Sequence, residues 1–275
     1  TNAGFEFSLA YDGGDSNYSD PGAFRYTIGL NGGYSKNAVE FIDEVSGAPD
    51  WQLQEGKPLG AYLLYESDGV WYDEAEIAAN TLDYSQVTNQ LRPGDLKLVD
   101  YDKNGKIDGD DMVRQEDSFT PRLQYGITLD MSYKNFDLSV LFQGSQGGLT
   151  TLFNGEFGDW GNYYKYQHDN RWSIDNPSRV HPRLASRGDT WYTGGGYGNN
   201  TYNYGSTDYL RLKNIELGYN LPQEFLGQGF ISNFRLYASG LNILTFTEFG
   251  MTDPEVANRT YPLQKVWNLG LRVNF

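Results

Sequence analysis

Alternating apolar and polar residues recur along the chain. Such a period of two predicts β-strands, because successive side chains of a strand point to opposite faces. The final stretch shows it most clearly, with Asn, Gly and Arg on one face and an apolar set on the other, namely Trp267, Leu269, Leu271, Val273 and Phe275. About eight strands are predicted: residues 4–11, 24–31, 58–69, 123–133, 136–144, 214–221, 234–246 and 267–275. Alternation is weaker in the third and the seventh, and in the seventh its phase shifts near Gly240, which predicts a bulge or a kink.

The connections between these strands differ sharply in length. Lys134 and Asn135 form a very tight turn between two strongly alternating strands. The long connections are residues 67–121, 145–208 and 247–265. Short turns that alternate with long loops are typical of outer-membrane β-barrels, in which the long loops are extracellular. The link over residues 35–57 is longer than this rule predicts.

Two architectures explain a sheet with one apolar and one polar face. A soluble β-sandwich turns its polar face to water, and that face is usually rich in Lys and Glu. Here the polar positions are mostly Gly, Ser, Asn, Thr and Gln with few charges, as in a wet lumen, and Tyr and Phe lie near the strand ends, as in an aromatic girdle. These features favour an all-β fold, a transmembrane antiparallel β-barrel with long extracellular loops.

Residues 100–111, "DYDKNGKIDGDD", have the spacing of a calcium-binding loop. The predicted ligands are Asp100, Asp102, Asn104, Asp108, Asp111 and the backbone carbonyl of Lys106. A hard cation takes about 6–8 oxygens at roughly 2.3–2.6 Å, and this spacing arranges oxygens around one point. Because the last position is Asp rather than a bidentate Glu, we expect weaker binding of Ca²⁺, or binding that tolerates Mg²⁺. The alternative is an acidic surface turn that holds no ion.

Composition argues against several other classes of protein. The net charge of −15 disfavours a nucleic-acid partner, which needs a basic surface. Without Cys and with only two His, a thiolate or histidine metal site is disfavoured. The sequence also has no phosphate-binding glycine loop and no serine-nucleophile motif, so we do not expect an enzyme.

A segment dense in aromatic residues follows the fifth predicted strand. Aromatic side chains with a polar group suit stacking on sugars or contact with a protein partner. The candidate contact residues are Trp160, Tyr163, Tyr164 and Tyr166. The alternative, which we favour, is that this segment packs a long loop against the rim of the barrel.

Several motifs in a fixed order resemble the SusC/RagA-type TonB-linked outer-membrane proteins. They are "PLGAYLLYESDGVW", "PGDLKLVDYDKNGKIDGDD", "YGITLDMSYKNFDLSVLFQGSQGG", "HDNRWSIDNPSRVHPRLA", "DYLRLKNIELGYNLP", "FRLYASGLNILTF" and "NLGLRVNF". The resemblance covers essentially the whole chain, residues 1–275. It implies the C-terminal part of a 22-stranded barrel whose plug domain and first strands lie outside this sequence.

The resemblance also implies function and partners. Family members import glycans, oligosaccharides or peptides through the bacterial outer membrane. They do so with a SusD-like surface lipoprotein, and the TonB complex acts on a segment N-terminal to the barrel. The final strand, Trp267 to Phe275, is expected to face lipid and to serve as the signal for barrel assembly. In this setting the calcium-type loop lies extracellularly and has a structural role.

Two other functions remain open. The chain could belong to a non-transporting structural or assembly barrel of the same family, or to a soluble, calcium-stabilised β-adhesin. For a barrel, we expect that these residues do not close a ring by themselves. An eight-stranded barrel has space only for packed side chains, and the polar face here suits a broader lumen. The first and last strands are therefore expected to pair with strands outside this sequence.

Overall fold

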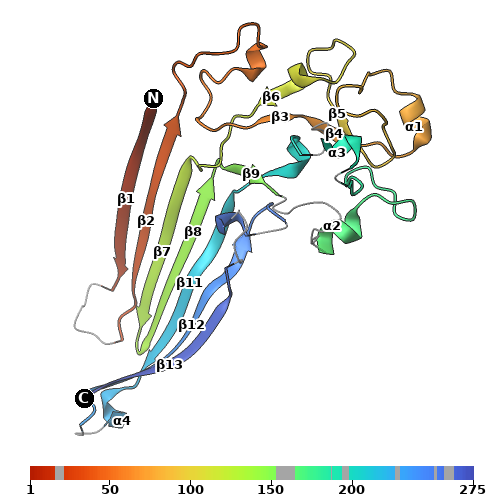
Figure 1. The fold of residues 1–275 in the computed structure, drawn as a ribbon. Coiled ribbons are helices and arrows are strands. Elements are labelled where there is room, and N and C mark those ends of the chain that lie inside the picture. The colour runs from red at the N-terminus through yellow and green to blue at the C-terminus, as the bar shows by residue number, and fades with distance from the viewer. Residues whose placement is uncertain are drawn as a thin grey trace.

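The structure is a computed structural model. It describes residues 1–15, 22–152, 165–186, 188–193, 198–226, 230–250, 253–256 and 263–275. One antiparallel sheet of seven strands dominates the described part of the chain, and its spatial order follows the order in the sequence (Figure 1). The strands are β1 (Asn2–Gly14), β2 (Arg25–Asn37), β7 (Leu123–Tyr133), β8 (Phe136–Gln146), β11 (Tyr209–Asn220), β12 (Asn233–Phe246) and β13 (Val266–Asn274). Seven of the eight predicted strands are therefore confirmed.

The predicted strand over residues 58–69 is wrong. This segment holds two short strands outside the main sheet, β3 (Leu63–Tyr65) and β4 (Ser67–Val70). They pair with β6 (Met112–Arg114) and β5 (Leu96–Leu98). Leu64 and Tyr65 are both buried, and Tyr65 belongs to a core that lies outside the sheet. Residues 38–122 therefore form a single long connection, and this explains the long link over residues 35–57.

The register of the sheet separates an apolar face from a polar face. One continuous cross-strand row reads Tyr11, Ile28, Leu129, Val140, Ile215, Gly240 and Trp267. The next row, on the other face, reads Asp12, Thr27, Asp130, Ser139, Glu216, Ser239 and Asn268. Because paired residues of antiparallel strands point to the same side, each row lies on one face. Large apolar side chains on the first face remain exposed in the described residues, among them Leu9, Leu217 and Leu269.

Aromatic rings mark both ends of the apolar face. At the end with the short turns, the ring of Phe136 lies 4.8 Å from that of Tyr219, and Phe24 contacts Tyr133 edge-on at 6.4 Å. At the other end the ring of Phe5 lies 5.8 Å from that of Tyr34. Aromatic residues at two levels along the strands are the arrangement of barrel girdles.

Turns and irregularities also follow the predictions. Lys134, with φ of 52°, and Asn135 make the two-residue turn between β7 and β8. The register of β11 shifts between Leu212 and Asn214 against both neighbouring strands, and Asn242 opposite has φ of 54°. The predicted irregularity near Gly240 is thus a β-bulge just beyond it.

The sheet does not close on itself. β1 and β13 are its two opposite edges, so no ladder joins them in the described part of the chain. This agrees with the expectation that these residues do not close a ring by themselves, and the pairing of both strands with strands outside this sequence stays a prediction. None of the described helices is long and apolar enough to cross a membrane.

The hydrophobic core lies outside the sheet. The two connections 38–122 and 147–208, here called the loop unit, pack together at the end of the sheet opposite the short turns (Figure 1). Their shared core contains Tyr65, Val70, Trp71, Tyr84, Val87, Leu96, Leu98, Ile107, Ala185 and Trp191. The small elements of the unit are η1 (Asp50–Gln52), α1 (Glu74–Ala78), η2 (Gly109–Asp111), β9 (Leu149–Thr151), α2 (Lys165–Asn170), α3 (Thr190–Thr193), η3 (Thr201–Asn203) and β10 (Tyr204–Ser206), with β3 to β6. Two elements remain: α4 (Gln223–Leu226) precedes β12, and η4 (Pro254–Val256) follows it.

Candidate functional site

The calcium-type loop brings three of its predicted ligands together. Carboxylate oxygens of Asp100, Asp102 and Asp111 all lie within 4.8 Å of one another. Asp108 is outside this group, because its Oδ1 accepts a hydrogen bond from the amide of Asp110 at 2.9 Å and caps η2. The amide side chain of Asn104 joins the group by donating from Nδ2 to Oδ2 of Asp102 at 2.8 Å.

Backbone conformation and anchoring explain the shape of this loop. Gly105 has φ of 86°, where the chain turns sharply and L-residues are strained. The amides of Asn104 and Gly105 donate to the two oxygens of Asp100 at 3.1 and 2.9 Å. Ile107 is completely buried in the core of the loop unit, and its amide donates to the carbonyl of Asp83 at 2.8 Å. The burial of Ile107 therefore anchors the loop to the core, and hydrogen bonds from backbone amides to its own carboxylates fix its shape.

The electrostatics of the loop fit a divalent cation. Asp111 is fully buried, and burial raises the pKa of its carboxyl group. Its oxygens accept hydrogen bonds from the amides of Tyr101 and Asp108, at 2.7 and 2.9 Å, so dipoles rather than a basic side chain balance its charge. Three carboxylates this close repel one another, and a hard cation with oxygen ligands would relieve that repulsion.

The same loop contacts the first part of the long connection. The indole Nε1 of Trp51 donates to the carbonyl of Asp110 at 2.7 Å, and Nε2 of Gln52 donates to that of Gly109 at 2.6 Å. The rings of Trp51 and Tyr101 are 5.1 Å apart. An ordered loop 100–111 thus holds η1 in place.

The aromatic candidates have separate outcomes. Trp160, Tyr163 and Tyr164 lie outside the described residues. Tyr166 lies on α2, is exposed, and meets the ring of His181 edge-on at 5.5 Å. The neighbouring Trp172 donates from Nε1 to the carbonyl of Tyr72 at 3.0 Å, across the two long connections. Trp172 therefore joins the two long connections to each other, and the packing of this segment against the rim of the barrel stays a prediction.

The final strand carries its apolar side chains on the exposed apolar face. Large exposed residues there are Trp267, Leu269, Leu271 and Phe275, and Val273 is partly buried. Phe275 follows the end of β13, and its ring lies 5.1 Å from that of Phe230. The assembly role of this strand stays a prediction.

The polar face carries two ion clusters that sequence reasoning missed. Arg211, almost fully buried, donates to Asp253 at 2.7 Å and to Glu255 at 2.8 Å, and Lys213 also pairs with Glu255. These contacts tie η4 to β11. The alternating pattern predicts that Arg211 and Lys213 lie on a strand. Their partners lie in a connection whose sequence has no alternating pattern, so its position could not be predicted.

The second cluster lies within the sheet. Arg235 forms salt bridges to Asp137 and to Glu216, the latter at 2.8 Å, and Asn220 donates to Asp137 at 2.9 Å. Alternation alone puts these side chains on the polar face. Only the register of β8, β11 and β12 brings them together, and the sequence does not state that register.

A large groove opens on the polar face beside the loop unit. The volume of this groove is about 1440 Å³. Its walls are formed by β1, β2, β7, β8, the start of β11 and by residues 119–122, 207 and 254–255. The lining mixes glycines, apolar rings and charged groups with hydrogen-bonding side chains of the polar face, such as Asn31, Gln124, Gln143 and Tyr209. Such groups form hydrogen bonds without fixing one sign of charge on a ligand.

Known proteins that resemble the chain define its class. No family model matches it. It is 30% identical over its whole length to TonB-dependent receptor P3 of Formosa agariphila, and 29% identical to TonB-dependent receptor P26 of the same organism. It spans only 28% and 29% of these relatives. Among solved structures, the RagAB peptide importer in the open-open state matches all of the chain with a TM-score of 0.63 at 22% identity, and the closed-closed state matches with 0.64 at 23%. The matched RagAB chains are likewise covered only to 28% and 29%.

The fold and the similar proteins together show that the sheet of this chain has the architecture of a transporter β-barrel wall. The chain belongs to the TonB-dependent receptors, and its fold agrees with the SusC/RagA type that its motifs indicate. The predicted resemblance is confirmed.

Proposed function

We propose that the chain forms part of the wall and the mouth of a TonB-dependent importer in the bacterial outer membrane. The observation that carries this proposal is the two-faced sheet. Its apolar rows are exposed, and its polar rows line a groove of about 1440 Å³. A wall between lipid and a wet lumen needs this division, because lipid-facing and lumen-facing residues alternate along barrel strands.

The cargo in this proposal is a nutrient oligomer, either a glycan, an oligosaccharide or a peptide. The amide side chains and the aromatic residues in the lining of the groove support such a cargo, because hydrogen-bonding side chains and aromatic rings suit flexible polar chains. The structural neighbours named as peptide importers favour a peptide among these classes.

The partners in this proposal are a SusD-like surface lipoprotein over the loop unit and the TonB complex on the opposite side of the membrane. The loop unit supports the first partner, because a separate hydrophobic core gives the mouth of the barrel a rigid docking platform. The two-component name RagAB of the structural neighbours is in keeping with such a partner.

The calcium-type loop has a structural role in this proposal. Asp100, Asp102 and Asp111 would hold one Ca²⁺ or Mg²⁺, with Asn104, the carbonyl of Lys106 and Asp108 as further ligands. The ion would neutralise clustered carboxylates and stiffen the part of the loop unit around Trp51.

Uptake by whole cells tests the importer. Cells with and without the complete receptor are given fluorescent oligopeptides and oligosaccharides, and one set is treated with a protonophore that removes the energy source of TonB. We expect uptake that needs both the receptor and the proton gradient. Equal uptake by cells lacking the receptor would favour the non-transporting barrel. Recovery of the protein in the soluble fraction without detergent would favour the adhesin.

A further inference from the structure

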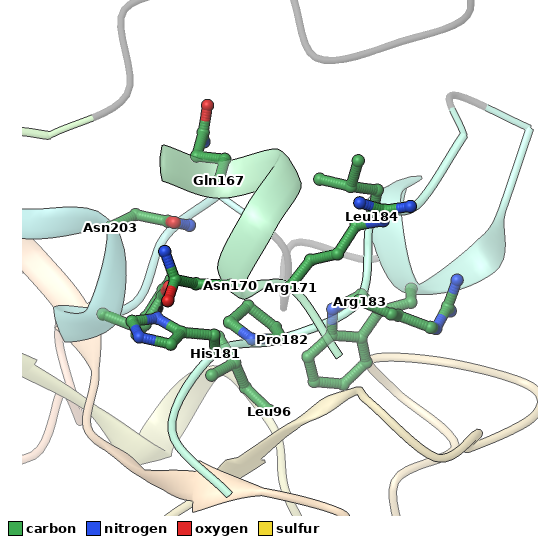
Figure 2. A pocket seen from close by; sticks show the side chains of 11 residues that line it. Leu96, Gln167, Asn170, Arg171, His181, Pro182, Arg183, Leu184 and Asn203 are labelled. Atoms are coloured by element: carbon green, nitrogen blue, oxygen red, sulfur yellow. Dashed lines mark hydrogen bonds between the residues drawn. The ribbon is translucent and has the colours of Figure 1, made fainter. Parts of the chain in front are cut away.

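A small pocket lies within the loop unit, apart from the groove and from loop 100–111. Figure 2 shows α2 above it, with Asn170 and Arg171 at the end of the helix, and with His181, Pro182 and Leu96 below. Trp191, which is 1% exposed, also lines it. The volume open to the centres of water-sized spheres in this pocket is about 30 Å³. A buried water needs roughly 10–15 Å³ on this measure, so there is room for about two such groups.

The lining of the pocket contains no carboxylate, although the protein as a whole has a net charge of −15. Its polar side chains include three amides, two guanidinium groups and one imidazole: Gln167, Asn170, Asn203, Arg171, Arg183 and His181. Burial lowers the pKa of His181, so its ring is neutral at neutral pH, and its Nδ1 shares a hydrogen bond of 2.9 Å with the hydroxyl of Tyr202.

The two arginines differ in their balance of charge. Arg183 pairs with Asp95 at 2.6 Å and with Asp189 at 2.9 Å, and Arg92 also pairs with Asp189, so these four charges cancel. Nη2 of Arg183 is nevertheless buried without a hydrogen bond in the described structure.

Arg171 has no such compensation. Its Nη1 donates to the backbone carbonyl of His168, and among the described residues no carboxylate forms a salt bridge with it. One positive charge at the pocket is therefore unbalanced, and Arg183, which also lines the pocket, has one buried donor without an acceptor.

We propose that this pocket binds the carboxylate group of a small ligand, with Arg171 as the main contact. A carboxylate has two oxygens, which matches the space for two water-sized groups, and it accepts paired hydrogen bonds from a planar guanidinium. A cation would be repelled, and a neutral amide would leave the charge of Arg171 unused. The carboxylate could come from a peptide C-terminus or from an acidic sugar, and the inference rests on the proposed importer only for this origin.

Calorimetry with matched ligand pairs tests the pocket. The complete receptor in detergent is titrated with N-acetyl-alanyl-alanine and its C-terminal amide, and with glucuronate and glucose. We expect only the charged member of a pair to bind, and the pair with the tighter charged member identifies the source of the carboxylate. Equal binding of charged and neutral members would overturn the proposal, as would binding of none. Because the measurement needs no energised membrane, its outcome is independent of whether the receptor imports anything.

Variants locate the binding site. Arg171→Gln should weaken binding of the charged ligand by about tenfold or more, since hydrogen bonds to charged groups are worth about 1.5–3 kcal/mol. Arg171→Lys keeps the charge but loses the planar pair of donors, so its affinity for the charged ligand should lie between those of the unaltered receptor and of Arg171→Gln. Arg179→Gln is the matched control, because Arg179 lies in the same connection but pairs with Glu76 outside the pocket. Unchanged affinity in Arg171→Gln, with unfolding temperatures equal among the variants, would overturn the assignment.

Discussion

The sheet and the loop unit are stabilised in opposite ways. The sheet has a clear period of two and leaves apolar side chains such as Leu217 and Leu269 exposed. The loop unit has no recognisable period, yet it contains the hydrophobic core, in which Val70, Val87 and Ile107 are almost completely buried. The comparison shows that the wall depends on its surroundings for burial, whereas the loop unit supplies its own. A lipid bilayer would bury the apolar face of the sheet, whereas the loop unit buries its apolar side chains without one.

The largest expected effect breaks the loop unit and spares the wall. Trp71→Ala removes a buried indole that meets the ring of Tyr84 edge-on, and such truncations cost about 3–5 kcal/mol. We expect proteases to cut residues 38–122 rapidly while the sheet stays membrane-embedded, as seen by limited proteolysis of the receptor in vesicles. Phe41→Ala is the control, because Phe41 is 82% exposed and should change little. Loss of the folded barrel together with the loop unit would contradict the independence of the two regions.

The second effect distinguishes the two faces of the wall. Leu269 and Asn268 are neighbours on β13, one on the apolar face and the other on the polar face. Leu269→Arg should destabilise the protein by about 2–4 kcal/mol in vesicles, because a lipid-facing charge is costly near the centre of the bilayer. Asn268→Arg should be nearly neutral, and denaturant titration of both variants measures the difference. Equal stabilities would favour a soluble protein, in which the 88% exposed Leu269 tolerates charge.

This comparison also explains what the sequence could predict. Strand 123–133 is predicted to the residue, because alternation is a local property of one strand. Residues 58–69 were assigned wrongly, because apolar residues there serve a core whose other members come from distant segments, such as Ala185 and Trp191. The three-carboxylate group was predictable from its spacing within residues 100–111. The ion pairs of Arg235 and the pocket around Arg171 were not, since each depends on tertiary register.

The third effect concerns the cation. At about 100 times its dissociation constant, Ca²⁺ should stabilise the loop unit by about 2.7 kcal/mol, and chelation should remove this. Hydrogen exchange of residues 38–122 measures it, with the sheet as an internal reference. Asp102→Asn should abolish the response, whereas Asp110→Asn should keep it, because Asp110 is exposed and outside the three-carboxylate group. Identical exchange with and without Ca²⁺ would favour the ion-free acidic turn.

The fourth effect tests the last residue of the wall. Deleting Phe275 removes a ring that is 73% exposed and that stacks, among the described residues, with the ring of Phe230, so we expect a loss of about 1–2 kcal/mol at most. If the final strand is the assembly signal, the amount of folded protein in the outer membrane should nevertheless fall several-fold. Heat-modifiability on gels measures that amount. Normal amounts after the deletion would count against the assembly role and against the barrel itself.

The smallest expected effect probes backbone strain in the loop unit. Gly105 has φ of 86°, and a Cβ added there meets no atom within 4 Å. Gly105→Ala would therefore cost only the left-handed backbone conformation, about 1 kcal/mol. Because Gly105 lies between Asn104 and Lys106, two of the predicted ligands, the strain should also weaken Ca²⁺ binding by about fivefold if the cation needs this turn. Gly47→Ala is a suitable control, since Gly47 also has φ of 86° and open space but lies far along the chain from the loop. Equal losses of stability in the two variants, with Ca²⁺ affinity lowered only in Gly105→Ala, are the expected result. An unchanged affinity in Gly105→Ala would show that the turn is not part of the cation site.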